Sequence, residues 1–264
     1  MMQFWHALVQ IVAEVFPVSS SSHVRLLEKI FSLDSVPSSI DGLLHLPMLV
    51  ILLLFYAQPV WVWIHADSLW IKKTVKAIWW GFCASVSMSV IVGILLALRG
   101  APLLRMPLWG SFLVTALWLV ALKLVQNYVR RDVSLNMWRA LVIGCVQGLS
   151  YGCGFSRLAS TFVTGRMLGL SADKAFWFSW WIDLPVMAFG IFREGFFEIY
   201  RASSDGCAAI TFFSNYLVIA MVIMLTVVGY GCFVLSARMA NRDQLWWWSV
   251  YLILPLTIAV YSKI

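Results

Sequence analysis

Two short polar stretches carry the residues that could do chemistry, and both interrupt otherwise apolar sequence. The first, residues 14–23, contains Glu14, a proline, four consecutive serines and His23. A carboxylate inside a membrane segment costs several kcal/mol, so an ionisable group there usually serves a function. Serine runs alone often make only caps and turns, but a carboxylate, hydroxyls and an imidazole within one break suit acid–base chemistry. The open alternative is a surface amphipathic helix over residues 3–18 that keeps Glu14 in water.

The second polar stretch, residues 152–161, is suited to holding an anion. Its glycines let the backbone approach a ligand, and Arg157 offers a bidentate fork for phosphate oxygens. A helix that starts near residue 158 would add the positive end of its dipole. Three hydroxyl side chains can donate hydrogen bonds: Ser156, Ser160 and Thr161. The alternative is that Arg157 snorkels to the membrane interface or pairs with Glu14 in a purely structural role.

Together the two stretches offer the groups that an anionic phosphate on a lipid would need. Glu14 could hold a divalent metal together with the phosphates. A hydroxyl activated by His23 could attack phosphorus, while Arg157 stabilises the charge of the transferring phosphoryl group. The residues therefore predict phosphoryl chemistry at membrane depth.

The composition indicates the elements that must position these residues. The chain has 264 residues, of which 62% are hydrophobic and only 12% charged, with a mean hydropathy of +0.87. So few charges cannot cover a soluble globule of this size, and we predict an all-α polytopic membrane protein. Six apolar runs are long enough, or nearly so, to span a bilayer. They lie at 46–64, 77–98, 107–126, 175–192, 211–237 and 245–262.

Each polar stretch belongs to a broken apolar region. Residues 3–18 are followed by a modest apolar piece at 24–33, and residues 138–155 by another at 161–170. A helix broken by Pro or Gly and polar residues, then a second short helix, is typical of a re-entrant hairpin. Irregular backbone at that depth is tolerated only inside protein or beside a polar cavity. We therefore predict two re-entrant helical hairpins besides the six spans.

Loop charges predict an orientation. The loops at 65–76, 127–139 and 238–244 are rich in Lys and Arg and are expected on the cytoplasmic side, whereas the charge-balanced loop at 193–210 is expected outside. The 99–105 loop, with Arg99 and Arg105, would also be external, a mild violation. With this orientation the two hairpins enter from opposite faces.

The two halves of the chain also align weakly. Gln10 pairs with Gln147, and Ser19 with Ser156, at the same offset. This predicts a single domain, residues 1–264, built as an inverted repeat of about 1–126 and 127–264, an architecture of many transporters.

Other features exclude several functional classes. A net charge of +7 is explained by lysines and arginines at helix ends that touch anionic lipid head groups, and no nucleic-acid-binding motif is present. The five cysteines are scattered without metal spacing. The N-terminus lacks a basic region, so no cleavable signal peptide is expected.

Several runs resemble the undecaprenyl-diphosphatase family, also called UppP or BacA. The run Gln10-Ile-Val-Ala-Glu14-Val-Phe-Pro-Val-Ser-Ser20-Ser-Ser-His23 resembles the family's first signature, and Gly154-Phe-Ser-Arg157-Leu-Ala-Ser-Thr161 resembles the second. Leu44-His-Leu-Pro-Met-Leu and Leu168-Gly-Leu-Ser171 resemble two further runs, and the length and hydropathy layout match along nearly the whole chain.

The resemblance implies hydrolysis of undecaprenyl diphosphate to the monophosphate, which recycles the lipid carrier of the bacterial cell wall and underlies bacitracin resistance. It implies a divalent cation, Mg²⁺ or Ca²⁺, and a multi-pass protein of the bacterial cytoplasmic membrane whose site faces the exterior. The expected partners are this lipid, membrane lipids and a second copy of the chain in a homodimer. The implied catalytic residues are Glu14, also the metal ligand, the nucleophile Ser20, the base or acid His23 and the phosphate clamp Arg157. The implied substrate-binding residues are Gln10, Ser19, Ser156, Ser160 and Thr161.

The sequence departs from the family pattern at a few positions. Gln10 is neutral where many members have a second Glu, which removes one possible metal ligand. Leu158 removes a hydroxyl of the second signature, and Cys153, Ala159, Pro47 and Ser22 are further changes. Two alternatives remain open: a transporter that flips a polyprenyl-phosphate lipid, and a paralogue without activity.

Overall fold

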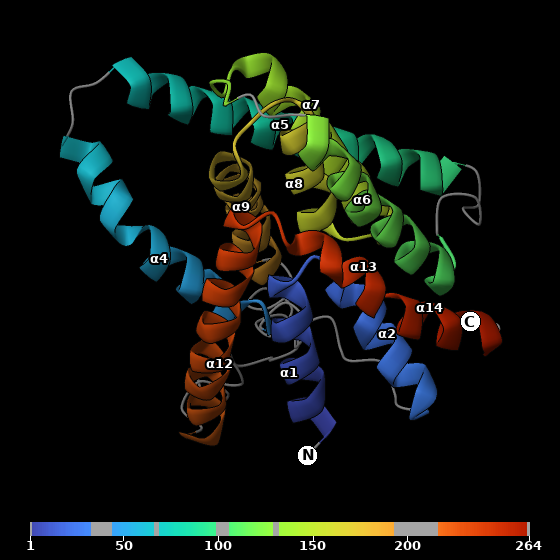
Figure 1. Cartoon of the computed structure of the whole chain (residues 1–264). Helices are drawn as coiled ribbons and strands as arrows, with labels where there is room; N and C mark the ends of the chain where they lie inside the picture. The colour runs from blue at the N-terminus through green and yellow to red at the C-terminus, as the bar shows by residue number, and fades with distance from the viewer. Residues whose placement is uncertain are drawn as a thin grey trace.

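A computed structural model describes residues 2–32, 44–65, 69–98, 106–128, 132–192 and 216–262, and all regular structure in these ranges is helical. This confirms the predicted all-α class. In chain order the helices are α1 (Met2–Val15), α2 (Ser20–Ile30), α4 (Leu46–His65), α5 (Leu69–Leu98), α6 (Leu108–Tyr128), α7 (Met137–Cys153), α8 (Arg157–Met167), α9 (Ala172–Gly190) and α12 (Tyr216–Asn241), followed by the 3₁₀-helix η2 (Leu245–Trp247), α13 (Trp248–Tyr251) and α14 (Ile253–Tyr261) (Figure 1).

Both predicted helix breaks are present. The chain leaves α1 through a turn that contains Pro17 and re-enters helix at Ser20, after Ser19 adopts the left-handed region with φ of 68°. The second break follows α7, where Gly154 takes φ of 82°, which glycine adopts without a Cβ penalty. Ser156 then caps α8 by accepting a hydrogen bond from the Ala159 amide. Each half of the chain thus begins with a helix, a short break and a second helix.

Five of the predicted apolar runs correspond to single helices, namely α4, α5, α6, α9 and α12. The sixth run is not one helix but η2, α13 and α14 in succession. Pro255 contributes to this division, because it has no N–H to donate to the carbonyl one turn earlier, where α13 ends. Helix α5 also begins at Leu69 rather than at residue 77, so residues 72, 73 and 76, expected in a loop, lie within the helix.

The predicted loops that set the orientation are only partly covered. Residues 99–105, Arg130, Arg131 and the 193–210 loop lie outside the described residues. Arg238, expected in a loop, lies in the last turn of α12. At the predicted cytoplasmic end, Arg139 donates from Nε to the Leu168 carbonyl at 3.1 Å, and Lys174 pairs with Asp132 at 2.8 Å.

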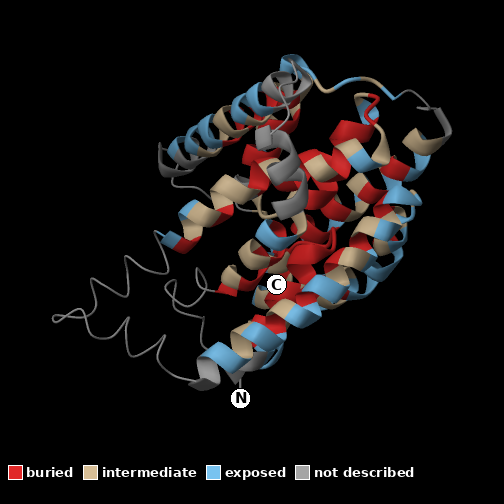
Figure 2. Cartoon of the chain, turned by 90° about the vertical axis from the view of Figure 1, so that its left-hand side faces the viewer, coloured by how far each residue is buried: buried red, intermediate tan, exposed pale blue. Residues whose placement is uncertain are grey.

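The outer surface is strongly apolar. Among the described residues, Leu108–Gln126 and Ile219–Asn241 are long and apolar enough to cross a membrane, and only 39% and 22% of their apolar windows are buried in the protein. Leu117, Leu124, Ile223 and Val227 are at least half exposed on these helices. Figure 2 shows buried residues inside the helical bundle and exposed ones along the outer helix faces. This exposed apolar area is what a lipid-facing surface requires.

Close packing of α5 against α7 fixes the helix before the second break. A Cβ on Gly144 would overlap the Gly81 carbonyl oxygen, and a Cβ on Gly148 would overlap the Ser85 carbonyl oxygen. Two glycines spaced by four residues let helix backbones approach closely, as in small-residue contacts between membrane helices. Gln147, beside Gly148, is held between this contact and α9.

Candidate active site

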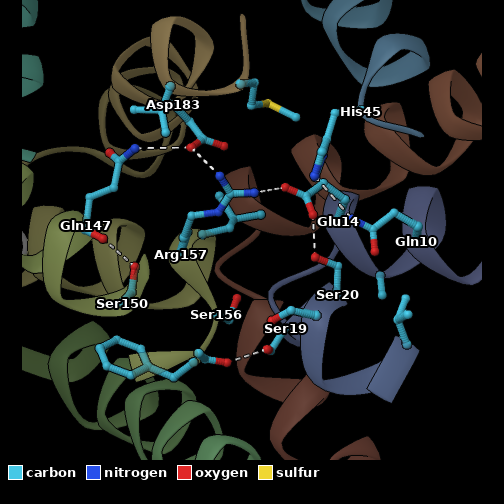
Figure 3. Close-up of a pocket in the computed structure, with 18 of the residues that line it drawn as sticks. Gln10, Glu14, Ser19, Ser20, His45, Gln147, Ser150, Ser156, Arg157 and Asp183 are labelled. Atoms are coloured by element: carbon cyan, nitrogen blue, oxygen red, sulfur yellow. Dashed lines mark hydrogen bonds and ion pairs between the residues drawn. The ribbon is translucent and has the colours of Figure 1, made fainter. Parts of the chain in front are cut away.

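The two helix breaks meet, and between them lies a cavity of about 660 Å³ (Figure 3). Ser19 on the first break donates from Oγ to the Gly154 carbonyl of the second at 2.8 Å, and Ser22 donates to the same oxygen at 3.2 Å. These bonds join segments that are 135 and 132 residues apart in the sequence. The principal polar residues that line the cavity are Gln10, Glu14, Ser20, Gln147, Arg157 and Asp183.

Glu14 lies at the centre of this cavity, near the end of α1, and is 7% exposed. Its Oε1 accepts a hydrogen bond from Nη2 of Arg157, and its Oε2 accepts one from Oγ of Ser20. The structure therefore brings together three of the four residues expected to be catalytic. A serine hydroxyl that donates to a buried carboxylate is arranged to lose its proton to that carboxylate.

Arg157 reaches a second carboxylate on α9. Its Nη1 donates to Oδ1 of Asp183 at 2.9 Å, and Gln147 donates from Nε2 to the same oxygen at 3.1 Å. Asp183 is 5% exposed. In Figure 3 the guanidinium lies between Asp183 and Glu14, so the order of charges is negative, positive, negative.

The smaller polar residues of the second break mainly stabilise the start of α8. The Ser156 amide donates to Oγ1 of Thr115 at 3.1 Å, and the Ser156 hydroxyl caps the helix. Ser160 and Thr161 donate back to the Arg157 carbonyl at 3.0 and 2.8 Å. Thr161 lines the cavity, whereas Ser160 is fully buried behind it.

His23 is not directed at Ser20 in this conformation. Its Nδ1 lies 2.9 Å from the Ser19 carbonyl, which can only accept, so Nδ1 carries the proton. Nε2 is then the acceptor for the Tyr251 hydroxyl at 3.1 Å. The ring stacks on Tyr251 and meets Phe112 edge-on, with centroids 5.7 and 5.0 Å apart. Both ring nitrogens are thus committed to other partners, and an acid–base role for His23 requires it to leave them.

Gln10 lies beside Glu14 in Figure 3, and its amide nitrogen is 3.4 Å from Nε2 of His45. This contact has a counterpart in the other half of the chain, where Gln147 bonds Asp183. The sequence separations are 35 and 36 residues. In each half, a glutamine on the first helix thus contacts a residue that follows the second helix.

Three members of this site, Asp183, Gln147 and His45, are absent from the site residues inferred from the sequence. Asp183 has a clear signal, since it is an acid near the middle of an apolar run. Gln147 was detectable as the repeat partner of Gln10. His45 belongs to a run that resembles the family, but it lies outside the two polar stretches.

The donor atoms at this site suit a hard divalent cation. No group of three or more His, Cys, Asp or Glu residues among the described residues could hold a metal ion. Mg²⁺ and Ca²⁺ prefer oxygen ligands, and Mg²⁺ is commonly held by one or two carboxylates plus substrate phosphates. The carboxylate of Glu14, which lines the cavity, is a ligand of that kind.

Comparison with known proteins gives consistent results. A family model described as bacitracin resistance protein BacA matches residues 3–257. An undecaprenyl-diphosphatase of Rhodopirellula baltica is 24% identical over 249 residues, which make up 94% of this chain and 91% of that protein. A protein of the same name from Halothermothrix orenii is 26% identical over 209 residues, 78% of this chain and 77% of the relative. A third, from Elusimicrobium minutum, is 29% identical over 186 residues, 69% and 70% of the two chains.

Proposed function

The chain belongs to the family of the bacitracin resistance protein BacA, and on that premise we propose that it is an undecaprenyl-diphosphatase. It hydrolyses undecaprenyl diphosphate to undecaprenyl phosphate and inorganic phosphate, and so recycles the lipid carrier of the cell wall. The observation that carries this proposal is the junction of Ser20, Glu14 and Arg157, which pairs a hydroxyl and a carboxylate with a phosphate-binding cation.

Substrate binding relies on Arg157 and the N-terminus of α8. The guanidinium provides charge-assisted hydrogen bonds to phosphate oxygens, and the helix begins at Arg157 itself, so its positive end faces the same space. A diphosphate that enters the cavity competes with Glu14 for the guanidinium. Ser19, Ser156 and Thr161 support the two breaks around it.

The chemistry starts at Ser20. Glu14 accepts the hydroxyl proton, and Oγ of Ser20 attacks the terminal phosphorus, forming a phosphoserine while the bond to the undecaprenyl phosphate oxygen breaks. Arg157 stabilises the charge on the transferring phosphoryl group. A water then attacks the phosphoserine, which restores the Ser20 hydroxyl and releases phosphate. His23 serves this second step as acid or base after leaving Tyr251.

A divalent cation, Mg²⁺ or Ca²⁺, would be held by the carboxylate of Glu14 with the diphosphate oxygens. It would neutralise phosphate charge in the site. We expect chelation with EDTA to abolish phosphate release by the purified protein, and added Mg²⁺ or Ca²⁺ to restore it. Full activity after exhaustive chelation would contradict this cofactor.

We further propose how the protein lies in the membrane. Six spans and two re-entrant hairpins form an inverted repeat in the bacterial cytoplasmic membrane, with the cavity open to the exterior. The meeting of the two breaks and the matched contacts Gln10–His45 and Gln147–Asp183 support this repeat. We also propose that two copies assemble as a homodimer. The molecular mass of the protein in detergent would test this.

Phosphate release in detergent micelles tests the proposed function. A phosphatase needs no second compartment, so wild-type protein should release one phosphate from each undecaprenyl diphosphate. A lipid flippase would release none, although it would move undecaprenyl phosphate across reconstituted vesicles. Absence of release under conditions in which the protein is folded would exclude the phosphatase and leave the transporter or an inactive paralogue.

A further inference from the structure

Asp183 is a charged residue in a surrounding where a charge is costly. It lies in the middle of α9, between apolar residues of the segment Ala172–Gly190, and is 5% exposed. A buried carboxylate is retained only where it is paired and hydrogen-bonded, or where it is used. Two donors satisfy Oδ1 of Asp183, namely Nη1 of Arg157 at 2.9 Å and Nε2 of Gln147 at 3.1 Å.

The partner of Asp183 is the phosphate-binding arginine. Arg157 therefore has two anchors on different elements, Glu14 from α1 and Asp183 from α9. Glu14 is not a dedicated anchor, since its second oxygen also accepts a hydrogen bond from the Ser20 hydroxyl. The described hydrogen bonds of Asp183 come from Arg157 and Gln147, and neither donor is the proposed nucleophile.

Asp183 itself is held firmly. Gln147 donates both to its Oδ1 and to the Ile182 carbonyl at 3.4 Å. Gln147 is 1% exposed and is followed by Gly148, whose close contact with α5 sets the position of α7. The α5–α7 contact thus positions Gln147, Gln147 holds Asp183, and Asp183 in turn holds Arg157.

We propose that Asp183 is the positioning residue for Arg157: it keeps the guanidinium oriented toward the phosphate while Glu14 is bonded to Ser20. This inference rests on the proposed phosphatase function. It has a distinctive consequence, because Asp183 also places a negative charge beside an anionic substrate. Removing that charge should impair orientation but not weaken electrostatic attraction for a diphosphate.

The test is a comparison of turnover and binding in Asp183→Asn and wild type. We expect kcat to fall by about 100-fold, the scale of a small misplacement of a catalytic group. The Kd for inorganic pyrophosphate, measured by calorimetry on the purified protein, should stay within a few-fold of wild type or become tighter. Asp132→Asn is the matched control, since the side chain of Asp132 is 59% exposed and its ion pair is with Lys174, outside the cavity. It should match wild type in both measurements.

The outcomes separate cleanly. An unchanged kcat in Asp183→Asn, or a fall in kcat matched by equal weakening of pyrophosphate binding, would overturn the positioning role. If Asp183→Asn does not fold, Gln147→Ala keeps the carboxylate but removes its second donor. It should lower kcat by about 10-fold with pyrophosphate affinity retained, and wild-type kcat would count against the proposal. Wild-type protein that binds pyrophosphate but releases no phosphate would instead refute the proposed function.

Discussion

The guanidinium of Arg157 pairs with two buried carboxylates, so we expect it to stabilise the fold besides its proposed role in the reaction. The side chain of Arg157 is 18% exposed, and the side chains alone of Glu14 and Asp183 are 4% and 7% exposed. Pairs at such sites differ from surface pairs, which contribute only about 0–1 kcal/mol. Removing one member of a buried pair costs about 3–5 kcal/mol, because an uncompensated charge remains inside the protein.

We therefore predict that Arg157→Ala destabilises the protein by about 3–5 kcal/mol. Thermal unfolding in detergent, followed by tryptophan fluorescence, should show a clearly lower midpoint than wild type. Combining Arg157→Ala with Glu14→Gln and Asp183→Asn removes the uncompensated charges and should recover part of the loss. A triple variant no more stable than the single one would show that charge balance is not what Arg157 contributes.

Arg157→Lys isolates the geometry of the guanidinium from its charge. Lysine keeps a positive charge but has no planar fork, so it cannot bridge two carboxylates and a phosphate in fixed directions. We expect phosphate release to fall by roughly 100-fold while the protein remains folded. Activity close to wild type would mean that a point charge at this position is sufficient.

At the residue scale the sequence predicted part of the site. Glu14, Ser20 and Arg157 were found because they stand out in apolar surroundings and match family signatures, and the structure places them in contact. From the sequence alone, a pairing of Arg157 with Glu14 is only a structural alternative to phosphate binding. The direction of His23 could not be predicted, because it depends on Tyr251, which is 228 residues away in the sequence.

At the scale of helices, the close contact with α5 fixes the position of α7, the helix that precedes the second break. Gly148 approaches the α5 backbone so closely that a side chain cannot be accommodated, whereas a Cβ on Gly231 of α12 would meet nothing within 4 Å. Valine at position 148 must push the helices apart. Valine at position 231 changes only the intrinsic helix propensity of that position.

We accordingly predict that Gly148→Val sharply reduces the yield of folded protein, and that Gly231→Val does not. Size-exclusion chromatography of detergent extracts, with a fluorescent fusion as reporter, measures both. Equal yields of the two variants would show that the α5–α7 contact is not essential for folding.

Helix positions were largely predictable from hydropathy, and their interruptions less so. Runs of apolar residues predicted α4, α6, α9 and α12 to within a few residues. Hydropathy does not predict the division of the sixth run, because the residues on both sides of Pro255 are apolar. The breaks near Pro17 and Gly154 were predicted since polar residues accompany them.

At the scale of the whole molecule, the orientation in the membrane is still a prediction from loop charges. Cys207 belongs to the loop expected outside, and Asp132 to one expected in the cytoplasm. A membrane-impermeant maleimide added to spheroplasts should label Cys207 in wild type. A cysteine placed at Asp132, in a Cys207→Ser background, should react only after permeabilisation. The reverse pattern would invert the orientation and place the cavity on the cytoplasmic side.

The central claim is that the junction of the two halves, at Glu14, Ser20 and Arg157, is a diphosphatase active site. The most direct measurement is the rate of phosphate release from undecaprenyl diphosphate by purified Ser20→Ala in detergent. Ser134→Ala serves as the control, since Ser134 is exposed and does not line the cavity. We predict a rate lower by on the order of 10³ or more for Ser20→Ala, as for loss of a nucleophile, and an unchanged rate for the control. Wild-type release by folded Ser20→Ala would contradict the account.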